Sequence, residues 1–548
     1  CQYAAAEQAC RKAIQLAQNN PEAHNHLGVM LKAQNRFTDA EQAYRAALAL
    51  KPDYAEAWNN LGNALKHQGR PTEAEQSFRQ ALALTPQSAD VWNNLGNALQ
   101  HLYRLQEAEV AYRQALALRP AFADACYNLG VVLGETGRLS DAIDAYVQAL
   151  QLDDANSAAL DELIHLMLRA CLWDGLPPLV DELLRRFRSG ESDLNSFSLL
   201  DLPATAAEQL QCAQRNAARI QANVQMRYVH TPPTDWPARI KVGYLSYDYR
   251  QHPVAFLIGE LFALHNRKEF EVFALAIGPD DHSPTRQNIK DTCDHFIDLA
   301  PLSRTEAAAK IHELGIHVLV DLTGYTTGAR TEILALHPAP VQVNWLGYPG
   351  TMGAAYIEYI IADLTIIPPE LEYYYSEAVV RMPDCYQIND RRRPIAEHTP
   401  SRAACGLPED ALVFCSFNHT HKITAELYAL WMRVLKATPG SVLWLLESNE
   451  LASDNLHREA VAHGVDPARI VMAPRKPLAE HMARYRVADL ALDTFPYNSH
   501  TTASDALWVG CPLITCMGET FASRVAGSLL QAVGLSELIT NSFAEYET

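Results

Sequence analysis

A period of 34 residues runs through the first third of the chain and constrains its fold more than any other feature. Glycine recurs at this interval, and leucine, alanine and an aromatic residue recur with it. The repeated positions are Gly28, Gly62, Gly96 and Gly130; Leu27, Leu61, Leu95 and Leu129; Ala40, Ala74, Ala108 and Ala142; Tyr44, Phe78, Tyr112 and Tyr146; and Leu48, Leu82, Leu116 and Leu150. Small residues let the two helices of a unit approach closely, and the aromatic ring is expected to fill the space between neighbouring units. The period predicts a stack of two-helix units, because one unit alone cannot bury its apolar face.

The repeat resembles the tetratricopeptide repeat, including its W-x-x-L-G pattern at Trp58 and Trp92. About four full units are present, with a leading half unit and a degenerate unit after Asp153. We assign residues 1–188 to this array. The leading half unit, and a first residue that is Cys1 rather than Met, indicate an array that begins upstream or is frayed at its start.

Asn25, Asn59 and Asn93 recur on the first helix of successive units. An amide offers both a donor and an acceptor, so a line of amides along a solenoid can bind the backbone of an extended peptide whatever its sequence. The alternative is that these asparagines solubilise the array or bridge its parts. We predict peptide binding along this line.

The composition excludes several classes of protein. The chain has 548 residues and a formal net charge of −19, which argues against general binding to nucleic acid or anionic membranes. No apolar run is long enough to cross a bilayer, and no signal-peptide pattern is present. Eleven cysteines without a C-x-x-C pair indicate neither a zinc site nor a disulfide framework. We expect a cytoplasmic protein.

The repeat period fades in residues 189–238, which we assign to a helical connector. A helix is predicted from Ala206 to Val224. The prolines Pro232, Pro233 and Pro237 then indicate a domain boundary.

After the connector, short apolar segments alternate with helical patterns, which predicts parallel sheets covered by helices. Residues 239–390 form one Rossmann-like α/β half, and residues 391–548 form a second. Two such halves leave a cleft at the carboxyl ends of their strands, where ligands bind. Neither half contains G-x-G-x-x-G, which disfavours a dehydrogenase.

The segment ADLALDTFPYNSHTTASDALWVG in the second half predicts a buried strand, a polar turn and a helix that begins near His500, Thr501 and Thr502. The first N–H groups of a helix favour phosphate, and these side chains add donors for a diphosphate. Asp505 lies near enough to accept a hydrogen bond from a ribose hydroxyl. A simple helix cap by Ser499 or Thr501 is the alternative.

A second candidate lies after the predicted strand ALVFCSF, which runs directly into Asn418-His419-Thr420-His421-Lys422. A lysine at the carboxyl end of a strand is well placed to neutralise phosphate. An ordinary surface lysine is the alternative, but the HTT segment in the same half favours a phosphate site.

In the first half, His252 lies in the loop that leaves the first strand, where it could act as a base or contact a sugar. His317 is interpreted as a partly buried strand residue with a satisfied hydrogen bond. The glycines Gly347, Gly350 and Gly353 would allow close approach of the backbone to a sugar, and a plain tight turn explains them equally well.

Together with the repeats, the motifs LTGYTTGAR, APVQVNWLGYPGTMGA, FNHTHKI, HTTASDALWVG and GETFASRVA resemble the protein O-linked N-acetylglucosamine transferase family over essentially the whole chain. The resemblance implies the GT-B arrangement of two Rossmann-like halves. It also implies inverting transfer of N-acetylglucosamine from UDP-GlcNAc, the donor substrate, to Ser/Thr hydroxyls of proteins. No metal or other cofactor is implied. The partners would be acceptor proteins or peptides bound along the array.

The resemblance further implies roles for individual residues. Those implied for catalysis are His252, Lys422 and His317; for nucleotide binding, His419, Lys422, Lys476, Leu478, His481, His500, Thr501, Thr502 and Asp505; and for the sugar pocket, Gly350 and Tyr497. Lys422 would bind the diphosphate and stabilise the departing charge, and Asp505 would bind the ribose.

The chain departs from the animal members of this family at three of its site positions. His419 and His421 stand where those members typically have Gln and Tyr, and Tyr497 stands where they have Cys, close to the expected acetamido position. The sequence DTFPY itself resembles the Spindly-type protein O-fucosyltransferases. Transfer of fucose or glucose to protein, or a non-enzymatic peptide-binding scaffold, are therefore the alternatives.

Overall fold

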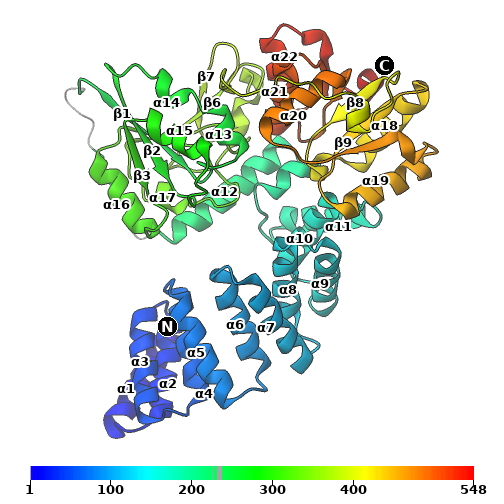
Figure 1. Cartoon of the computed structure of the whole chain (residues 1–548). Helices are drawn as coiled ribbons and strands as arrows, with labels where there is room; N and C mark the ends of the chain where they lie inside the picture. The colour runs from blue at the N-terminus through cyan, green and yellow to red at the C-terminus, as the bar shows by residue number, and fades with distance from the viewer. Residues whose placement is uncertain (1, 225, 231–236) are drawn as a thin grey trace. The chain divides into compact units, whose positions relative to one another are not determined.

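The computed structural model describes residues 2–224, 226–230 and 237–548. The chain forms two compact units, Cys1–Leu166 and Met167–Thr548 (Figure 1). The first unit is all helical, and the second contains both sheets. The predicted fold class, a helical array followed by two α/β halves, is confirmed.

The first unit is a stack of paired helices, as the 34-residue period predicts. Its helices are α1 (Gln2–Leu16), α2 (Pro21–Ala33), α3 (Phe37–Leu50), α4 (Ala55–His67), α5 (Pro71–Leu84), α6 (Ala89–His101), α7 (Leu105–Leu118), α8 (Ala123–Glu135), α9 (Leu139–Leu152) and the larger part of α10 (Ser157–Arg169).

The repeated glycine and the repeated aromatic residue contact each other within one unit. A Cβ atom added to Gly28 would lie 2.4 Å from the ring of Tyr44, and one added to Gly62 would lie 2.6 Å from the ring of Phe78. Only glycine leaves this space to the ring, which is why the two positions recur together. We expected the ring between neighbouring units, and the structure instead places it against the glycine of its own unit.

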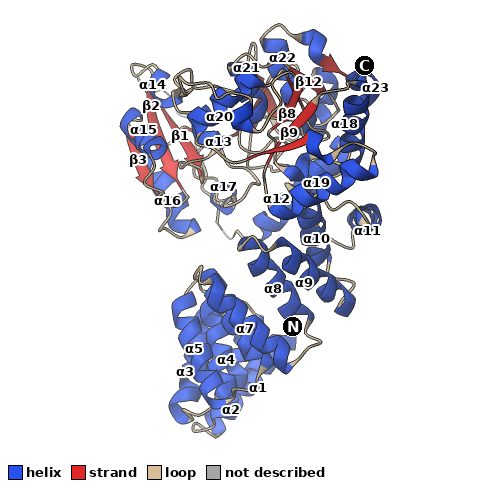
Figure 2. Ribbon diagram, turned by 45° about the vertical axis from the view of Figure 1, so that its right-hand side comes forward, coloured by secondary structure: helices blue, strands red, loops and turns tan. Residues whose placement is uncertain are grey.

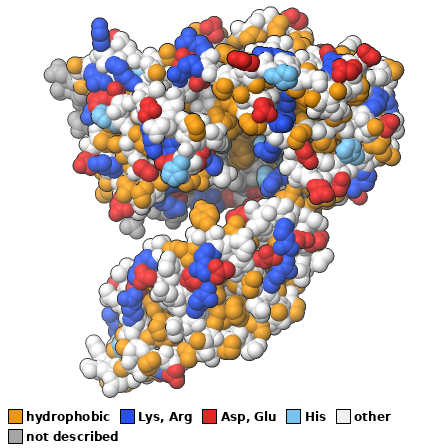
Figure 3. Space-filling model, in the orientation of Figure 1, with side chains coloured by type: hydrophobic (Ala, Val, Ile, Leu, Met, Phe, Trp, Pro, Cys, Tyr) orange, Lys and Arg blue, Asp and Glu red, His pale blue; other side chains and the backbone are white. Residues whose placement is uncertain are grey.

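Ion pairs repeat along the array with the same period. Arg104 pairs with Glu75 of the preceding unit at 2.7 Å and with Glu107 of its own unit at 2.6 Å. Arg36, Arg70 and Arg138 form the equivalent pairs. Acidic and basic side chains accordingly gather in clusters along the array (Figure 3). Such partly exposed pairs contribute only about 0.2–1 kcal/mol each, so the apolar core supplies most of the stability.

The connector is helical, with α11 (Leu176–Ser189), the 3-10 helix η1 (Ser198–Asp201) and α12 (Ala206–Ala222). A capping box of Thr205 and Glu208 begins α12. Pro232 and Pro233 of the expected boundary lie outside the described residues. The division between the compact units falls at Leu166, so α11, which we assigned to the array, belongs to the second unit.

The first α/β half is a seven-stranded parallel sheet with the order β3-β2-β1-β4-β5-β6-β7. Its strands are β1 (Ile240–Ser246), β2 (Phe270–Ala276), β3 (His295–Asp298), β4 (Val318–Asp321), β5 (Val341–Asn344), β6 (Tyr359–Ala362) and β7 (Ala378–Arg381). Its helices are α13 (Pro253–Leu257), α14 (Leu261–Leu264), α15 (Pro284–Thr292), α16 (Arg304–Leu314), α17 (Glu332–Ala335) and the 3-10 helix η2 (Pro369–Tyr374).

The second half is a six-stranded parallel sheet with the order β10-β9-β8-β11-β12-β13. Its strands are β8 (Val413–Ser416), β9 (Val442–Leu446), β10 (Ile470–Ala473), β11 (Leu490–Leu492), β12 (Leu513–Cys516) and β13 (Ile539–Thr540). Its helices are α18 (Ala425–Ala437), α19 (Glu450–Ala462), α20 (Leu478–Arg484), α21 (Thr501–Trp508), α22 (Val525–Ala532) and α23 (Phe543–Glu547). Short 3-10 helices are η3 (Ala403–Cys405), η4 (Thr420–Lys422), η5 (Pro467–Arg469), η6 (Tyr485–Val487), η7 (Phe521–Ser523) and η8 (Ser536–Leu538).

Helices cover the faces of both sheets (Figure 2), which buries strands such as β1, β2 and β8 and explains their continuous apolar sequences. The two halves also contact each other directly. Ser528 of α22 donates a hydrogen bond to Asp363 at 2.6 Å, and Arg524 donates one to the carbonyl oxygen of Thr365 at 2.7 Å. Within the described ranges, no helix is both long and apolar enough to cross a membrane.

Candidate functional site

A cleft of about 290 Å³ lies at the carboxyl ends of the strands, between the two α/β halves. Residues of both halves and one residue of the connector line it. The lining residues are Phe197, Asp248, Arg250, His252, Pro253, Val254, Leu257, Thr326, Thr327, Leu346, Gly347, Tyr386, Gln387, His419, His421, Lys422, Tyr497, His500, Thr501 and Thr502. Six of the residues that we predicted by sequence to act in catalysis or nucleotide binding are in this set, together with Tyr497 of the predicted sugar pocket.

The two phosphate-site candidates of the second half meet because their strands are neighbours. Strand β8 pairs in parallel with β11, so η4 and the start of α21 emerge at the same edge of the sheet. Lys422 Nζ donates a hydrogen bond to the carbonyl oxygen of Asn498 at 2.8 Å. It also lies 3.6 Å from the centroid of the Tyr497 ring. Burial lowers the pKa of Lys422 to about 8.

The loop between β11 and α21 is held by the buried carboxylate of Asp493. This carboxylate accepts hydrogen bonds from the backbone N–H groups of Thr494 at 2.8 Å and Ser499 at 2.6 Å, and from the hydroxyl of Thr515 at 2.5 Å. Burial raises the pKa of Asp493 to about 6. These bonds fix the point at which α21 begins, and so place a helix N-terminus beside Lys422, an arrangement that attracts anions.

Two histidines beside Lys422, His419 and His500, are held mostly uncharged by their surroundings. Burial lowers the pKa of His419 to about 4, and electrostatic interaction with its neighbours, Arg475 and Lys422 among them, lowers it further. Burial also lowers the pKa of His500 well below its ordinary value. These two rings therefore offer neutral hydrogen-bonding nitrogens at pH 7, and Lys422 supplies positive charge.

His252 of the first half lies on the opposite wall of the cleft and caps α13. Its Nδ1 accepts a hydrogen bond from the backbone N–H of Val254 at 3.3 Å, and it lies 3.6 Å from the carboxylate of Asp248. Burial lowers the pKa of His252, against the opposing effect of Asp248. A neutral imidazole with this orientation can accept a proton at neutral pH.

Two residues predicted for the site in the first half, His317 and Gly350, lie outside the cleft lining. His317 precedes β4 and so lies at the amino end of the sheet, where its Nδ1 accepts a hydrogen bond from the backbone N–H of Lys241 at 2.9 Å. This agrees with the interpretation from the residues, a satisfied strand histidine, and not with the active-site role that the resemblance implied. Gly350 does not line the cleft, and its carbonyl oxygen accepts a hydrogen bond from Asn344. Gly347 lines the cleft instead. A Cβ atom at this position would lie 1.9 Å from the carbonyl oxygen of Leu322, so the position requires glycine.

Asp505 does not line the cleft either. It forms a buried ion pair with Arg393, which lies at the start of the second half and whose side chain is 2% exposed. Burial raises the pKa of Asp505 to about 6, and Arg393 opposes this shift. Asp505 therefore meets a ribose only if this pair is rearranged or shared.

Three residues that the resemblance implied for nucleotide binding, Lys476, Leu478 and His481, lie just before or within α20, after β10, and outside the cleft lining. Lys476 is exposed and pairs with Glu480 at 3.5 Å. His481 contacts the rings of Phe417 and Tyr485. Burial lowers the pKa of His481 to about 3. Whether Lys476, Leu478 and His481 bind a base stays a prediction.

In the array, Asn25, Asn59 and Asn93 recur along the first helices as predicted, and each forms a hydrogen bond with an asparagine of the next unit. The amide nitrogens of Asn60, Asn94 and Asn128 donate to the side-chain oxygens of Asn25, Asn59 and Asn93, at 3.1, 3.0 and 3.0 Å. Each bond joins neighbouring units, so the bridging role that we gave as an alternative is present. Peptide binding along the line stays a prediction.

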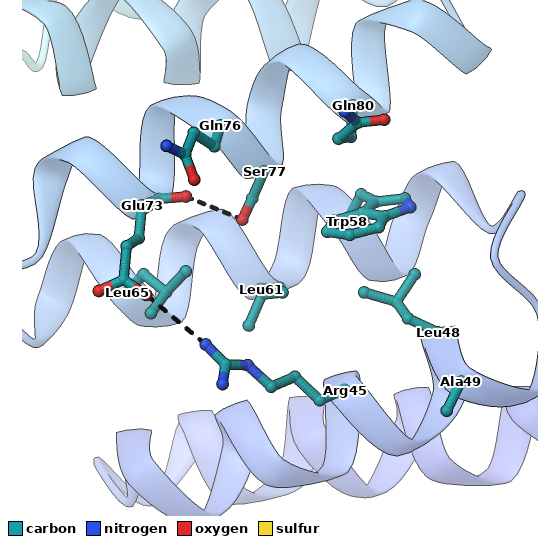
Figure 4. Close-up of a pocket in the computed structure, with 10 residues that line it drawn as sticks. All are labelled: Arg45, Leu48, Ala49, Trp58, Leu61, Leu65, Glu73, Gln76, Ser77 and Gln80. Atoms are coloured by element: carbon teal, nitrogen blue, oxygen red, sulfur yellow. Dashed lines mark hydrogen bonds and ion pairs between the residues drawn. The ribbon is translucent and has the colours of Figure 1, made fainter.

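The array also carries a groove of about 770 Å³ between α3, α4 and α5 (Figure 4). Trp58, Leu61 and Leu65 of α4 line it together with Arg45 of α3 and Glu73 of α5, which pair with each other at 3.6 Å. None of the three predicted peptide-binding asparagines lines it.

Several cleft residues were not predicted from the sequence. Arg250, Tyr386 and Gln387 lie in loops without a recognised motif. Thr326 and Thr327 belong to LTGYTTGAR, a motif that indicated the family but gave no prediction for an individual residue. Phe197 comes from the connector, for which we predicted no contact with a ligand. Within the described ranges, no group of three or more His, Cys, Asp or Glu side chains has an arrangement that could hold a metal ion.

Comparison with protein-family models gives matches over most of the chain. Residues 200–403 and 394–548 match the model of glycosyl transferase family 41. Residues 2–52, 27–89, 89–122 and 123–156 match models of the tetratricopeptide repeat.

Two curated relatives are similar to this chain. One is the probable UDP-N-acetylglucosamine–peptide N-acetylglucosaminyltransferase SEC of Arabidopsis thaliana, 35% identical over 407 residues, which covers 70% of this chain and 42% of the relative. The other is the UDP-N-acetylglucosamine–peptide N-acetylglucosaminyltransferase of Caenorhabditis elegans, 30% identical over 420 residues, with 56% of this chain and 36% of the relative covered. The chain thus spans less than half the length of these relatives.

One solved structure is similar over nearly the whole chain. A lysine-to-methionine mutant of the Thermobaculum terrenum O-GlcNAc transferase superposes with a TM-score of 0.63 and 26% identity, covering 90% of this chain and 88% of that one. The similarity extends over the repeat array and both α/β halves. The two α/β halves form the GT-B arrangement.

Proposed function

Because this chain belongs to glycosyl transferase family 41, we propose that it is an inverting, metal-independent glycosyltransferase that moves N-acetylglucosamine from UDP-GlcNAc to Ser/Thr hydroxyls of proteins. The observation that carries the proposal is the position of Lys422. Its partly buried ammonium lies in the cleft beside the first residues of α21, and no carboxylate in the described part of the chain forms an ion pair with it. The Lys422 ammonium and the N-terminus of α21 together can neutralise the negative charge of a nucleoside diphosphate.

Donor cleavage places negative charge on the β-phosphate as its bond to the sugar breaks. Lys422 and the N–H groups and hydroxyls of Thr501 and Thr502 would stabilise this charge without a metal ion. Fixed donors in a water-poor cleft cost little reorganisation, so they stabilise a developing charge more than water does.

Inversion requires the acceptor hydroxyl to attack the anomeric carbon from the face opposite to the diphosphate. His252 stands on the wall opposite to Lys422, and its lowered pKa leaves it neutral and able to accept the hydroxyl proton. We propose His252 as the general base.

The acceptor would be an extended protein segment bound along the array. Asn59 and Asn93 accept hydrogen bonds from the next unit through their side-chain oxygens, which leaves their N–H groups as donors for a peptide carbonyl. Ten described cysteines are all free thiols, which favours a reducing compartment such as the cytoplasm.

Tyr497 favours one alternative donor. Its ring lines the cleft beside Lys422 and narrows the space for the sugar, and DTFPY resembles the O-fucosyltransferase branch. A donor with a smaller sugar than N-acetylglucosamine, such as GDP-fucose, is the second candidate.

Isothermal titration with UDP, GDP, UDP-GlcNAc and GDP-fucose separates these possibilities. We expect binding of UDP and UDP-GlcNAc, with the same Kd in the presence and absence of EDTA. Preference for GDP and GDP-fucose would support the alternative donor, and loss of UDP binding in EDTA would contradict metal independence. A failure to bind any of the four would support a non-enzymatic scaffold.

A further inference from the structure

The ammonium group of Lys422 has an unusual set of partners for a partly buried cation. Its Nζ lies 3.6 Å from the centroid of the Tyr497 ring and donates to the carbonyl oxygen of Asn498 at 2.8 Å. Both partners are neutral and come from the same loop. Buried charges in proteins are normally paired with an opposite charge, so the ring occupies the place that a carboxylate would usually take.

The carboxylates nearest to Lys422 are engaged elsewhere. Asp201 accepts a hydrogen bond from His421, and Asp493 accepts hydrogen bonds from the loop that precedes α21. Both favour the charged form of Lys422 only from a distance. The other titratable groups that face it are His419 and His421 on its own turn and His500 at the start of α21.

We propose that the ring of Tyr497 is the counterpart that keeps Lys422 charged before a ligand binds and leaves that charge available to an arriving diphosphate. The negative face of an aromatic ring attracts an ammonium ion, yet the ring carries no net charge. A carboxylate in its place would also stabilise the ammonium, but it would repel a diphosphate and compete with it for the same cation. Tyr497 is thus a positioning residue that acts through Lys422.

The loop geometry holds the ring in this place. The hydroxyl of Thr494 donates to the carbonyl oxygen of Tyr497 at 2.7 Å. The ring packs against those of Phe197, His421 and His500, with centroids 6.4, 6.2 and 5.0 Å away. Tyr497 is 7% exposed, so water cannot replace the ring without a change of the loop.

Stepwise fluorination of the ring tests this proposal, because fluorine weakens the negative ring face and changes the ring size little. Position 497 is replaced by phenylalanine and by its 4-fluoro, 3,5-difluoro and 3,4,5-trifluoro derivatives in the full-length chain. The first readout needs no nucleotide: competitive labelling of Lys422 with acetic anhydride as a function of pH. We expect Tyr497→Phe to label like the unchanged chain, and the pH at which Lys422 becomes reactive to fall with each added fluorine.

The second readout is UDP affinity at two pH values, and it rests on the proposed function. At pH 6 the whole series should bind UDP alike, because Lys422 is protonated in every variant. At pH 9 the trifluoro variant should bind about 30-fold more weakly than the phenylalanine variant, the factor that a buried cation–π contact supplies. The ionisation of UDP is common to all variants and cancels in the comparison.

A matched control places the same fluorinated residues at Phe414, which is buried in β8 of the same half. This series should change neither the labelling curve nor the pH dependence of binding. A flat labelling curve across the Tyr497 series, or one that Phe414 reproduces, would overturn the proposal. Absence of UDP binding by the unchanged chain would instead overturn the proposed function, since the labelling result does not depend on it.

Discussion

Asp201 of the connector accepts a hydrogen bond from Nδ1 of His421, which lies 3.0 Å from both carboxylate oxygens. The Asp201 side chain is 1% exposed, and His421 lines the cleft. Thr420 of the same turn is held in a similar way, since its hydroxyl donates to the carbonyl oxygen of Arg169 at 2.6 Å. The turn that carries Lys422 is therefore attached to segments outside both α/β halves.

Replacing Asp201 by Ala should lower the free energy of unfolding by about 1.5–3 kcal/mol, because a buried charge-assisted hydrogen bond is lost. Urea denaturation measures this change. Asp193, which is exposed on the same connector, is the matched control, and Asp193→Ala should change stability by less than about 0.5 kcal/mol. Equal effects of the two substitutions would show that the Asp201–His421 bond does not hold the turn.

Replacing Lys422 by Ala should lower kcat about 10²–10³-fold, corresponding to the loss of about 3 kcal/mol of transition-state stabilisation. The thermal midpoint should change little, because the ammonium makes one hydrogen bond within the fold. Lys436 at the exposed end of α18 serves as the control, and Lys436→Ala should leave kcat unchanged. An unchanged rate in Lys422→Ala would remove this residue from the mechanism.

The pH profile of kcat/KM should be bell-shaped. Lys422 must be charged to meet the diphosphate, so activity should fall as the pH rises through about 8. His252 must be neutral to accept a proton, and its lowered pKa predicts that the acidic limb lies below its ordinary value of 6.5. In His252→Ala the residual activity should lose the acidic limb and keep the alkaline one. Persistence of both limbs would assign the base to another group.

The asparagine line gives a prediction with an internal control. Replacing Asn59 and Asn93 by Ala should weaken long acceptors and spare short acceptors and UDP, because each main-chain hydrogen bond is worth about 0.5–1.5 kcal/mol. The partners Asn94 and Asn128 belong to the same bridges. Asn94→Ala and Asn128→Ala should reproduce the effect on long acceptors in full only if the asparagines act as bridges between units. That result would contradict peptide binding by Asn59 and Asn93. KM for acceptors of two lengths is the measurement.

Sequence reasoning succeeded where a local pattern has one geometric meaning. The 34-residue period predicted the array, although it did not predict that Tyr44 packs against Gly28 of its own unit. Lys422 and Thr501 both follow buried parallel strands, so their meeting at one sheet edge was predictable once β8 and β11 were neighbours. For His317 the resemblance implied an active-site role, whereas its position before β4 puts it at the opposite edge of the sheet, as its interpretation as a strand histidine predicts.

The remaining differences arise from long-range partners that no local pattern encodes. Asp505 lies in the motif that predicted a ribose contact, yet its carboxylate forms an ion pair with Arg393. Asp201 contacts His421 because the connector packs against the turn that carries Lys422. Neither pair has a sequence signal in a single chain, because the residues are more than a hundred positions apart.

The central claim is that the Lys422 cleft transfers N-acetylglucosamine to protein, and intact-mass spectrometry of an acceptor tests it most directly. A long Ser/Thr-containing acceptor is incubated in EDTA with UDP-GlcNAc or with GDP-fucose, using the unchanged chain and Lys422→Ala. The account predicts addition of N-acetylhexosamine from UDP-GlcNAc by the unchanged chain, and at most a trace by Lys422→Ala. Addition of fucose alone, a requirement for metal, or equal transfer by Lys422→Ala would contradict it.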